Sequence, residues 1–123
     1  MGQRTILTAD DNTQIRMLVK AALRSLGHEL IEAIDGEQAL EMAIEHRPDL
    51  VLLDVTMPKL DGWEVLHFMR QRPETAGTRV MMLTTASQTV DLEHGASLGC
   101  NDYLTKPFSP ADLRTRVERM LDA

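Results

Sequence analysis

Five polar residues each follow a short run of apolar residues, and their types suit one shared chemistry. They are the carboxylates Asp10, Asp11 and Asp54, the hydroxyl of Thr84 and the ammonium of Lys106. If the apolar runs form parallel strands, the residues after them meet at the carboxyl edge of the sheet. Open α/β sheets place their ligand sites at this edge, near the point where the strand order reverses. We therefore expect these five side chains to converge in one crevice.

The expected crevice holds more negative charge than its carboxylates can tolerate alone. Three neighbouring carboxylates repel each other, and without compensation one of them would keep its proton. A hard divalent cation removes this repulsion, and Mg²⁺ prefers a few carboxylates together with several waters. Lys106 brings a second positive charge to the same place. Such a site suits phosphoryl transfer, in which a carboxylate that accepts the group becomes an acyl phosphate. Thr84 could then donate a hydrogen bond to a phosphoryl oxygen.

Each of these residues also has an ordinary structural explanation. Asp10 or Asp11 alone would more often cap a helix than bind a ligand, and one of them could cap the first helix as well. Asp54 alone could be a turn residue at a strand end. Thr84 alone is a common strand residue, and Lys106 alone would be a solvated lysine. The functional interpretation depends on all five falling at the same end of consecutive strands.

Apolar runs and amphipathic stretches alternate five times along the chain. The apolar runs are residues 5–9, 29–33, 50–53, 80–83 and 103–105, and the stretches between them carry apolar residues at helical spacing. Strands that alternate with helices pair in parallel through right-handed crossovers. The runs 50–53 and 80–83 are apolar throughout, as in strands covered by helices on both faces, so they should be central together with the first. This predicts an α/β fold, a three-layer (βα)5 sandwich, with residues 1–123 as one domain.

Several residues mark the expected helix ends. Gly27 is placed to end the first helix, and Asp35 with Gln38 three residues later resembles a capping box. Ser109 and Pro110 should begin the last helix as its N-cap and first residue. The fourth helix, at roughly residues 90–98, has a thin apolar stripe, and we expect it to be the least stable element.

Composition narrows the classes of function. The 123 residues include 13 Lys and Arg against 19 Asp and Glu, a formal net charge of −6. This disfavours direct binding to nucleic acid or to an anionic membrane, which needs clustered cations. The longest apolar run, residues 50–53, is too short to cross a bilayer. The single Cys100 allows neither an internal disulfide nor a thiolate zinc cluster, and it favours a cytoplasmic location.

Four segments of the sequence resemble the receiver (response regulator) domain of two-component signalling. They are Asp10-Asp11, residues 52–62, residues 82–84 and residues 98–108, and the resemblance extends from residue 5 to residue 121. It implies a flavodoxin-like, CheY-like fold whose parallel sheet has the strand order 2-1-3-4-5, an order that the alternation of elements also favours.

The resemblance implies a role for each residue of the acidic crevice. Asp54 resembles the phosphoacceptor and contributes to the metal site. Asp11 is similar to the direct Mg²⁺ ligand, and Asp10 to the acidic neighbour that binds through water. The backbone carbonyl of Thr56 resembles the third protein ligand. Lys106 resembles the cation that pairs with Asp54 and later with the phosphoryl oxygens.

A second set of implied roles concerns the switch. Thr84 resembles the switch hydroxyl, and Tyr103 the aromatic side chain that moves with it. Thr85 stands where the family usually has Ala, but Thr84 leaves no gap in the spacing to Lys106 and is preferred. The peptide bond between Lys106 and Pro107 is commonly cis in this family.

Two further positions depart from the family pattern. Cys100 is expected to be a small buried apolar residue. Asn101 stands where an acidic residue is common, and we expect it only to serve a turn.

The resemblance implies a phosphoacceptor signalling domain and not an enzyme, since it would catalyse only its own phosphorylation and dephosphorylation. A phosphohistidine of a sensor histidine kinase or of a phosphotransfer protein would donate its phosphoryl group to Asp54 in a Mg²⁺-dependent reaction. The surface formed by the fourth helix, the fifth strand and the fifth helix would then change and bind a downstream protein target. Two alternatives stay open: a stand-alone regulator, and a receiver from a longer response regulator or hybrid histidine kinase.

Three other classes of function fit the sequence less well. An aspartyl phosphohydrolase usually needs a second acidic residue two positions after its nucleophile, and residues 54–56 lack one. In a flavin-binding protein of the same architecture, Asp10-Asp11 would repel the flavin phosphate. A receiver-like domain that only docks would not need the full acidic set together with Thr84 and Lys106.

Overall fold

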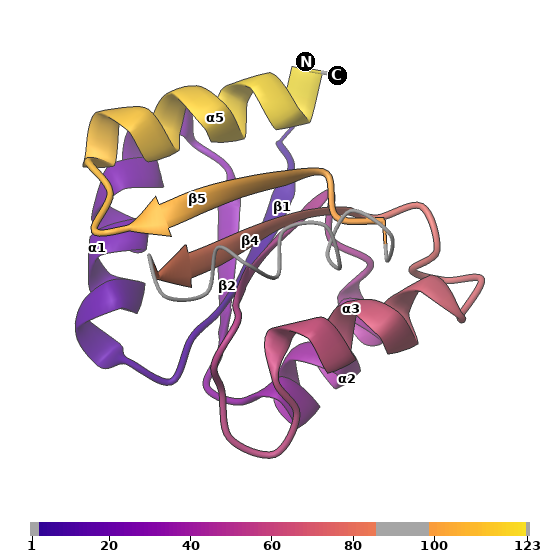
Figure 1. Cartoon of the computed structure of the whole chain (residues 1–123). Helices are drawn as coiled ribbons and strands as arrows, with labels where there is room; N and C mark the ends of the chain where they lie inside the picture. Colours follow the sequence, from indigo (N-terminus) through magenta and orange to yellow (C-terminus); the bar gives the residue numbers. More distant parts are fainter. Residues whose placement is uncertain (1–2, 86–98, 123) are drawn as a thin grey trace.

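A parallel five-stranded sheet forms the centre of the molecule (Figure 1). The computed structural model describes residues 3–85 and 99–122, and the predicted fourth helix lies outside them. The strands are β1 (Thr5–Ala9), β2 (Glu29–Ala33), β3 (Leu50–Asp54), β4 (Arg79–Thr85) and β5 (Asp102–Lys106). Their order is β2-β1-β3-β4-β5, and each neighbouring pair is parallel. The predicted order and the predicted central position of β1, β3 and β4 are therefore confirmed.

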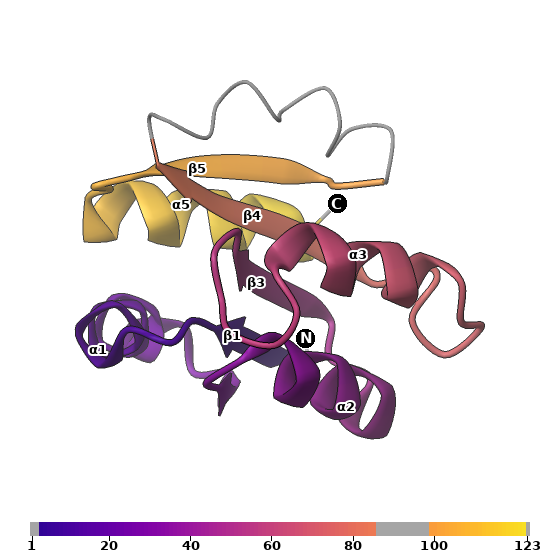
Figure 2. The same cartoon turned by 60° about the horizontal axis from the view of Figure 1, so that its bottom comes forward.

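Helices cover both faces of the sheet. Figure 2 shows α1 and α5 on one side and α2 and α3 on the other. Their bounds are α1 (Thr13–Leu23), followed by the short 3-10 helix η1 (Arg24–Leu26), then α2 (Gly36–His46), α3 (Gly62–Arg70) and α5 (Pro110–Asp122). None of the helices in the described ranges is long and apolar enough to span a membrane. The three-layer α/β sandwich expected from the sequence is confirmed.

Side chains that alternate along the strands divide the core into two clusters. The α1–α5 cluster lies between the sheet and those helices, and it includes Ile6, Leu50, Leu52, Leu83 and Leu113. The α2–α3 cluster lies on the other face, and it includes Leu7, Val51, Leu53, Val65 and Met82. All five residues of β3 are buried. A strand between two helical layers buries both faces, which explains why this run is apolar up to its last residue, Asp54.

The predicted helix ends are confirmed in part. Gly27 has a positive φ of 74° and ends the first helical segment, as expected. Ser109 Oγ accepts a hydrogen bond from the backbone N–H of Asp112 at 3.0 Å at the start of α5. The N-cap of α1, however, is Asn12, whose side chain accepts from two backbone N–H groups, so neither acidic residue before it has that role.

A complete capping box occurs at a different helix from the one predicted. At α2, Asp35 accepts from the backbone N–H of Gln38 at 2.7 Å, but the Gln38 side chain accepts from the N–H of Ile34 instead of that of Asp35. At α3, Asp61 and Glu64 make both reciprocal bonds. This box fixes the connection between β3 and α3, which directly follows Asp54.

The start of α3 approaches the end of β3 so closely that position 62 has no room for a side chain. A Cβ atom on Gly62 would lie 2.4 Å from the backbone oxygen of Asp54 and 2.8 Å from the methyl carbon of Met82. The backbone N–H of Gly62 also donates to the carbonyl of Val55 at 2.8 Å, which holds the two segments together. A side chain at this position would therefore push the Asp54 backbone out of place.

We predict that Gly62→Ala lowers the free energy of unfolding by about 1–3 kcal/mol, as overpacking in a tight core does. Gly77→Ala is the matched control, because a Cβ there meets nothing within 4 Å. Urea unfolding followed by circular dichroism measures both variants. Equal midpoints for Gly62→Ala and the unchanged protein would show that the approach is looser than described.

Candidate functional site

Three carboxylates meet at the carboxyl edge of the sheet, as the sequence predicts. Asp54 is the last residue of β3, and Asp10 and Asp11 directly follow β1, its neighbour in the sheet. One carboxylate oxygen from each of the three lies within 4.8 Å of the others. Asp10 is fully buried and Asp54 is 6% exposed, whereas Asp11 is exposed. The cluster therefore has a buried base and a side that faces solvent.

Lys106 places its ammonium between the two buried carboxylates. Its Nζ atom lies 3.0 Å from Asp10 Oδ2 and 3.0 Å from Asp54 Oδ1. Lys106 ends β5, and β4 separates that strand from β3. The side chain therefore reaches past the end of β4, and only 17% of its surface stays exposed. Lys106 is 96 positions from Asp10 and 52 positions from Asp54 in the sequence, so its placement confirms the predicted convergence of distant residues.

Further hydrogen bonds hold Asp10 in place. Its Oδ1 atom accepts from the backbone N–H of Asn12 at 2.9 Å, and its backbone N–H donates to the carbonyl of Ala33 at 3.1 Å. Its own carbonyl accepts from Arg16 Nη1 at 2.6 Å. Asp10 thus connects β1 to β2 and to the first turn of α1, which leaves its carboxylate little freedom to move away from Lys106.

Burial and neighbouring charges shift the pKa values of Asp54 and Lys106. Burial raises the pKa of Asp54 above its usual value, the hydrogen bond from Lys106 lowers it, and the nearby Asp10 charge raises it again. The net result is a raised pKa. Burial alone would lower the pKa of Lys106, but its hydrogen bonds to Asp54 and Asp10 outweigh burial, so that pKa is also raised. The single ammonium therefore offsets the cost of burying the Asp54 carboxylate only in part.

The donor set fits a hard divalent cation. Three carboxylates face one ammonium in this cluster, and all the candidate ligand atoms are oxygens. The exposed position of Asp11 leaves a solvent-facing side on which a cation such as Mg²⁺ could keep its waters. Thr56 lies two residues after Asp54 in the connection to α3, and it is exposed. Its role as a ligand through the backbone carbonyl stays a prediction.

Thr84 presents a buried hydroxyl next to this cluster. It follows Leu83, the residue of β4 that pairs with Asp54. Thr84 is fully buried, and its Oγ1 atom has no hydrogen-bond partner within residues 3–85 and 99–122. A buried hydroxyl without a partner costs free energy, so it would gain from a new acceptor at the site. Thr85, the alternative in the sequence, is only half-buried.

Tyr103 and the bond after Lys106 complete the predicted set. Tyr103 is half-buried and packs against the α2–α3 cluster from β5. The peptide bond between Lys106 and Pro107 is cis, as the family resemblance predicted. The cis bond directly follows Lys106 at the carboxyl end of β5, whereas Tyr103 is the second residue of that strand.

A group of contacts at the opposite end of β4 involves Asn101 and was not predicted from the sequence. The Asn101 side chain accepts from the backbone N–H of Val80 at 2.9 Å, and Arg70 Nη2 donates to the carbonyl of Gly99 at 2.8 Å. Asn101 therefore does more than serve a turn, because it fixes the segment before β5 to the start of β4. Cys100 is half-buried and packs against the α2–α3 cluster, as a small apolar residue would, but it is not fully buried, and its thiol donates to the carbonyl of Asp102 at 3.0 Å.

Comparisons with known proteins agree with this geometry. Residues 6–118 match the response regulator receiver domain family. The alkaline phosphatase synthesis transcriptional regulatory protein PhoP of Bacillus subtilis is 42% identical over 118 residues, which are 96% of this chain and 48% of PhoP. The probable transcriptional regulator ycf27 of Porphyridium aerugineum is 39% identical over 121 residues, 98% of this chain and 49% of that protein. The chain spans about half the length of these curated relatives.

Solved structures show the same similarity in three dimensions. A putative response regulator from Chloroflexus aurantiacus superposes with a TM-score of 0.92 at 34% identity and covers 99% of this chain and 100% of its own. The chemotaxis response regulator CheY4 of Vibrio cholerae gives 0.90 at 32% identity, with 97% and 99% covered. The receiver domain of sensor histidine kinase PA1611 from Pseudomonas aeruginosa gives 0.89 at 32% identity, with 99% and 100% covered, and its structure has a magnesium ion in the active site cleft.

The raised pKa of Asp54 predicts a stability that depends on pH. Since the folded protein holds this proton more tightly than the unfolded chain, the contribution of Asp54 is fully present below the unfolded pKa of 3.8. It is lost as the pH rises through the folded pKa. In metal-free protein, Asp54→Asn should therefore be more stable than the unchanged protein near neutral pH, and the difference should shrink as the pH falls.

Urea unfolding in the presence of EDTA, between about pH 4 and pH 8, measures this difference. Glu118→Gln is the control, because it removes one exposed carboxylate that has no ion pair among the described residues. A gain in stability that is the same at every pH would contradict the assignment to Asp54 ionisation.

Proposed function

Because the chain belongs to the response regulator receiver domain family of two-component signalling, we propose that Asp54 is the residue that accepts the phosphoryl group. The observation that carries this proposal is the position of the Asp54 carboxylate. It lies at the end of β3, in ion-pair contact with Lys106 and within 4.8 Å of two further carboxylates. Receiver domains interact with sensor kinases or phosphotransfer proteins, so the donor would be a phosphohistidine on such a partner.

The reaction transfers one phosphoryl group between two nucleophiles. A carboxylate oxygen of Asp54 attacks phosphorus, and the bond from phosphorus to the histidine nitrogen breaks with its electron pair returning to the imidazole. The product on Asp54 is a mixed anhydride, an acyl phosphate. Lys106 contacts Oδ1 of Asp54, which leaves the second oxygen for the attack. Its hydrogen bond also favours the ionised carboxylate, which is the nucleophile.

Charge compensation is the main task of the remaining site residues. Asp10, Asp11, Asp54 and the carbonyl of Thr56 would hold a magnesium ion, and that ion would neutralise charge on the phosphoryl oxygens. Lys106 adds its ammonium from the β5 side and would pair with a phosphoryl oxygen after transfer. The chain thereby promotes its own phosphorylation and dephosphorylation and acts on no further substrate.

The switch would begin at Thr84. Its hydroxyl, which has no partner in the described part of the chain, would donate to a phosphoryl oxygen on Asp54. Movement of Thr84 away from its resting position would let Tyr103 turn further inward from its half-buried position. The carbonyl of Tyr103 accepts from Arg116 Nη1 at 3.0 Å, and Arg116 also pairs with Asp102 at 3.2 Å. A change at Tyr103 would therefore reach α5 directly.

The proposed output is a changed surface on β5 and α5 that a downstream protein recognises. The curated relatives are named as transcriptional regulators and are about twice as long as this chain. The same receiver could serve in a longer regulator of that kind or act alone. In both cases the phosphodonor would be a cytoplasmic histidine, and this domain would contact protein partners, not nucleic acid or a membrane.

Phosphorylation by a small donor tests the assignment of Asp54. After incubation with phosphoramidate and Mg²⁺, intact mass spectrometry should show one phosphoryl group on the unchanged protein and none on Asp54→Asn. Glu45→Gln, which removes an exposed carboxylate on α2, should be phosphorylated like the unchanged protein. The mass of one phosphoryl group on Asp54→Asn would refute the proposal.

The metal site has its own test in Asp11. Asp11→Ala removes an exposed carboxylate from the cluster without disturbing the buried pair, so it should weaken Mg²⁺ binding by about tenfold or more. Isothermal titration calorimetry in phosphate-free buffer measures the affinity. Glu37→Gln removes an exposed carboxylate from a different acidic surface and should leave the affinity unchanged. Equal affinities for Asp11→Ala and the unchanged protein would argue against the proposed ligands.

A further inference from the structure

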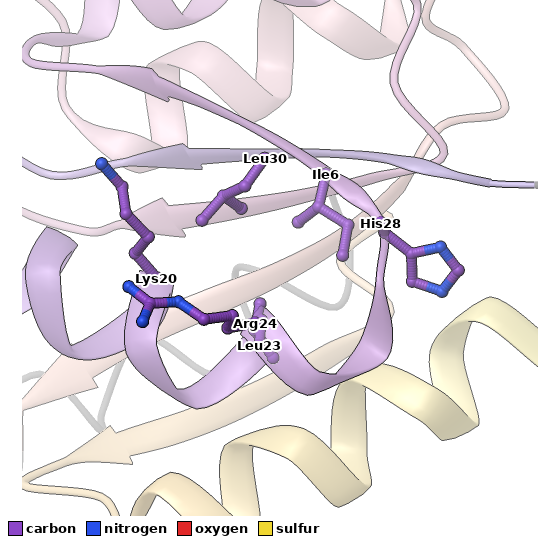
Figure 3. A pocket seen from close by; sticks show the side chains of 6 residues that line it. All are labelled: Ile6, Lys20, Leu23, Arg24, His28 and Leu30. Atoms are coloured by element: carbon purple, nitrogen blue, oxygen red, sulfur yellow. The ribbon is translucent and has the colours of Figure 1, made fainter.

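A second hollow lies at the other end of the sheet from the acidic cluster. It has a cavity volume of about 190 Å³ and opens between α1 with η1 and the strands β1 and β2 (Figure 3). Its lining residues are Ile6, Lys20, Leu23, Arg24, His28 and Leu30. Ile6 and Leu30 are paired neighbours near the amino ends of their strands, whereas Asp10 and Asp11 follow the carboxyl end of β1. The pocket is therefore separate from the proposed phosphorylation site.

The base of this pocket is apolar and sized for one small group. Ile6 and Leu23 are buried members of the α1–α5 cluster, and Leu30 is half-buried against the same cluster. An apolar cavity of about 150 Å³ is large enough to hold benzene. A pocket of this volume therefore accepts one aromatic ring or one branched aliphatic chain. Binding of such a group would release the ordered water over the apolar lining side chains.

The rim of the pocket is positively charged. Lys20 and Arg24 are four residues apart at the end of α1 and the start of η1, so their side chains emerge on the same side. Figure 3 shows the polar ends of both on the side of the pocket away from His28. Lys20 already pairs with Glu32 at 2.8 Å. Arg24 is exposed, and its guanidinium has neither a hydrogen bond nor an ion pair with the residues that the structure describes.

His28 lines the opposite side of the pocket, and Figure 3 shows its ring extending away from the other five residues. Its Nδ1 atom accepts from the backbone N–H of Arg4 at 3.0 Å. In the neutral imidazole this bond places the proton on Nε2, so the ring presents a donor and no free acceptor. The other polar groups of the lining side chains are the ammonium of Lys20 and the guanidinium of Arg24, which are both donors and suit an anion.

We propose that this pocket binds a small organic carboxylate with one ring or branched chain. The apolar part would lie on Ile6, Leu23 and Leu30, and the carboxylate would pair with the free guanidinium of Arg24. The apolar lining and the cationic rim together favour an organic carboxylate, because a neutral hydrocarbon would leave the cations unpaired and an amine would be repelled by them. The proposal is independent of phosphorylation, because no residue of the acidic cluster takes part.

The test compares two probes of the same shape that differ in charge. Sodium phenylacetate and phenylacetamide are titrated into the ¹⁵N-labelled protein, and backbone amide shifts report binding. Both should cause saturable shifts around residues 6, 23 and 30. An exposed ion pair adds modest free energy, so phenylacetate should bind about two- to fivefold more tightly than the amide.

The variant Arg24→Gln should remove this preference and leave the affinity for phenylacetamide unchanged. Arg119→Gln is the matched control, since it removes an exposed arginine that does not line the pocket. It should keep the preference, which excludes a general effect of net charge. The proposal fails if neither probe saturates, if the shifts map to Asp10 and Asp54, or if Arg24→Gln keeps the preference for the carboxylate.

Discussion

The structure of the site depends on one ammonium that lies between two buried carboxylates. Lys106 lies within 3.0 Å of both carboxylates, and its hydrogen bond lowers the pKa of Asp54 against the effects of burial and of the nearby Asp10 charge. The compensation is incomplete, since the pKa of Asp54 remains raised even with Lys106 in place. The three carboxylates outnumber the one ammonium, which explains why the site suits a cation. The hydrogen bond from Lys106 opposes the effect of burial and favours the ionised, nucleophilic form of Asp54.

The rest of the fold keeps this arrangement rigid. Parallel strands that are buried on both faces bring residues from distant parts of the chain to one edge, as open α/β sheets do at their ligand sites. Asn12 caps α1 directly after the acidic pair, and the capping box of Asp61 and Glu64 fixes the connection that follows Asp54. Gly62 allows that connection to approach the backbone of β3. These contacts position the segments that carry the three carboxylates next to one another at the edge of the sheet.

Much of this could be predicted from the sequence, because a parallel sheet leaves clear patterns. Continuous apolar runs identified the central strands, and the polar residue after each run marked the site edge. What the sequence did not reveal were contacts between side chains and backbone that depend on loop geometry. Asn12 was missed as the cap of α1, and Asn101 was expected only in a turn, although it bonds to the start of β4. The preference for Thr84 over Thr85 came from spacing, and the complete burial of Thr84 is consistent with it.

The two ends of α1 offer a physical route between the acidic cluster and the apolar pocket. Arg16 donates to the carbonyl of Asp10 at 2.6 Å and pairs with Glu32 at 3.4 Å, and Glu32 in turn pairs with Lys20 on the pocket rim. A carboxylate in the pocket would compete with Glu32 for the Lys20 charge, and Glu32 would then bind Arg16 more strongly. Any coupling must be reciprocal, so a ligand that changes Mg²⁺ affinity at the cluster must itself bind differently, by the same factor, when Mg²⁺ is present.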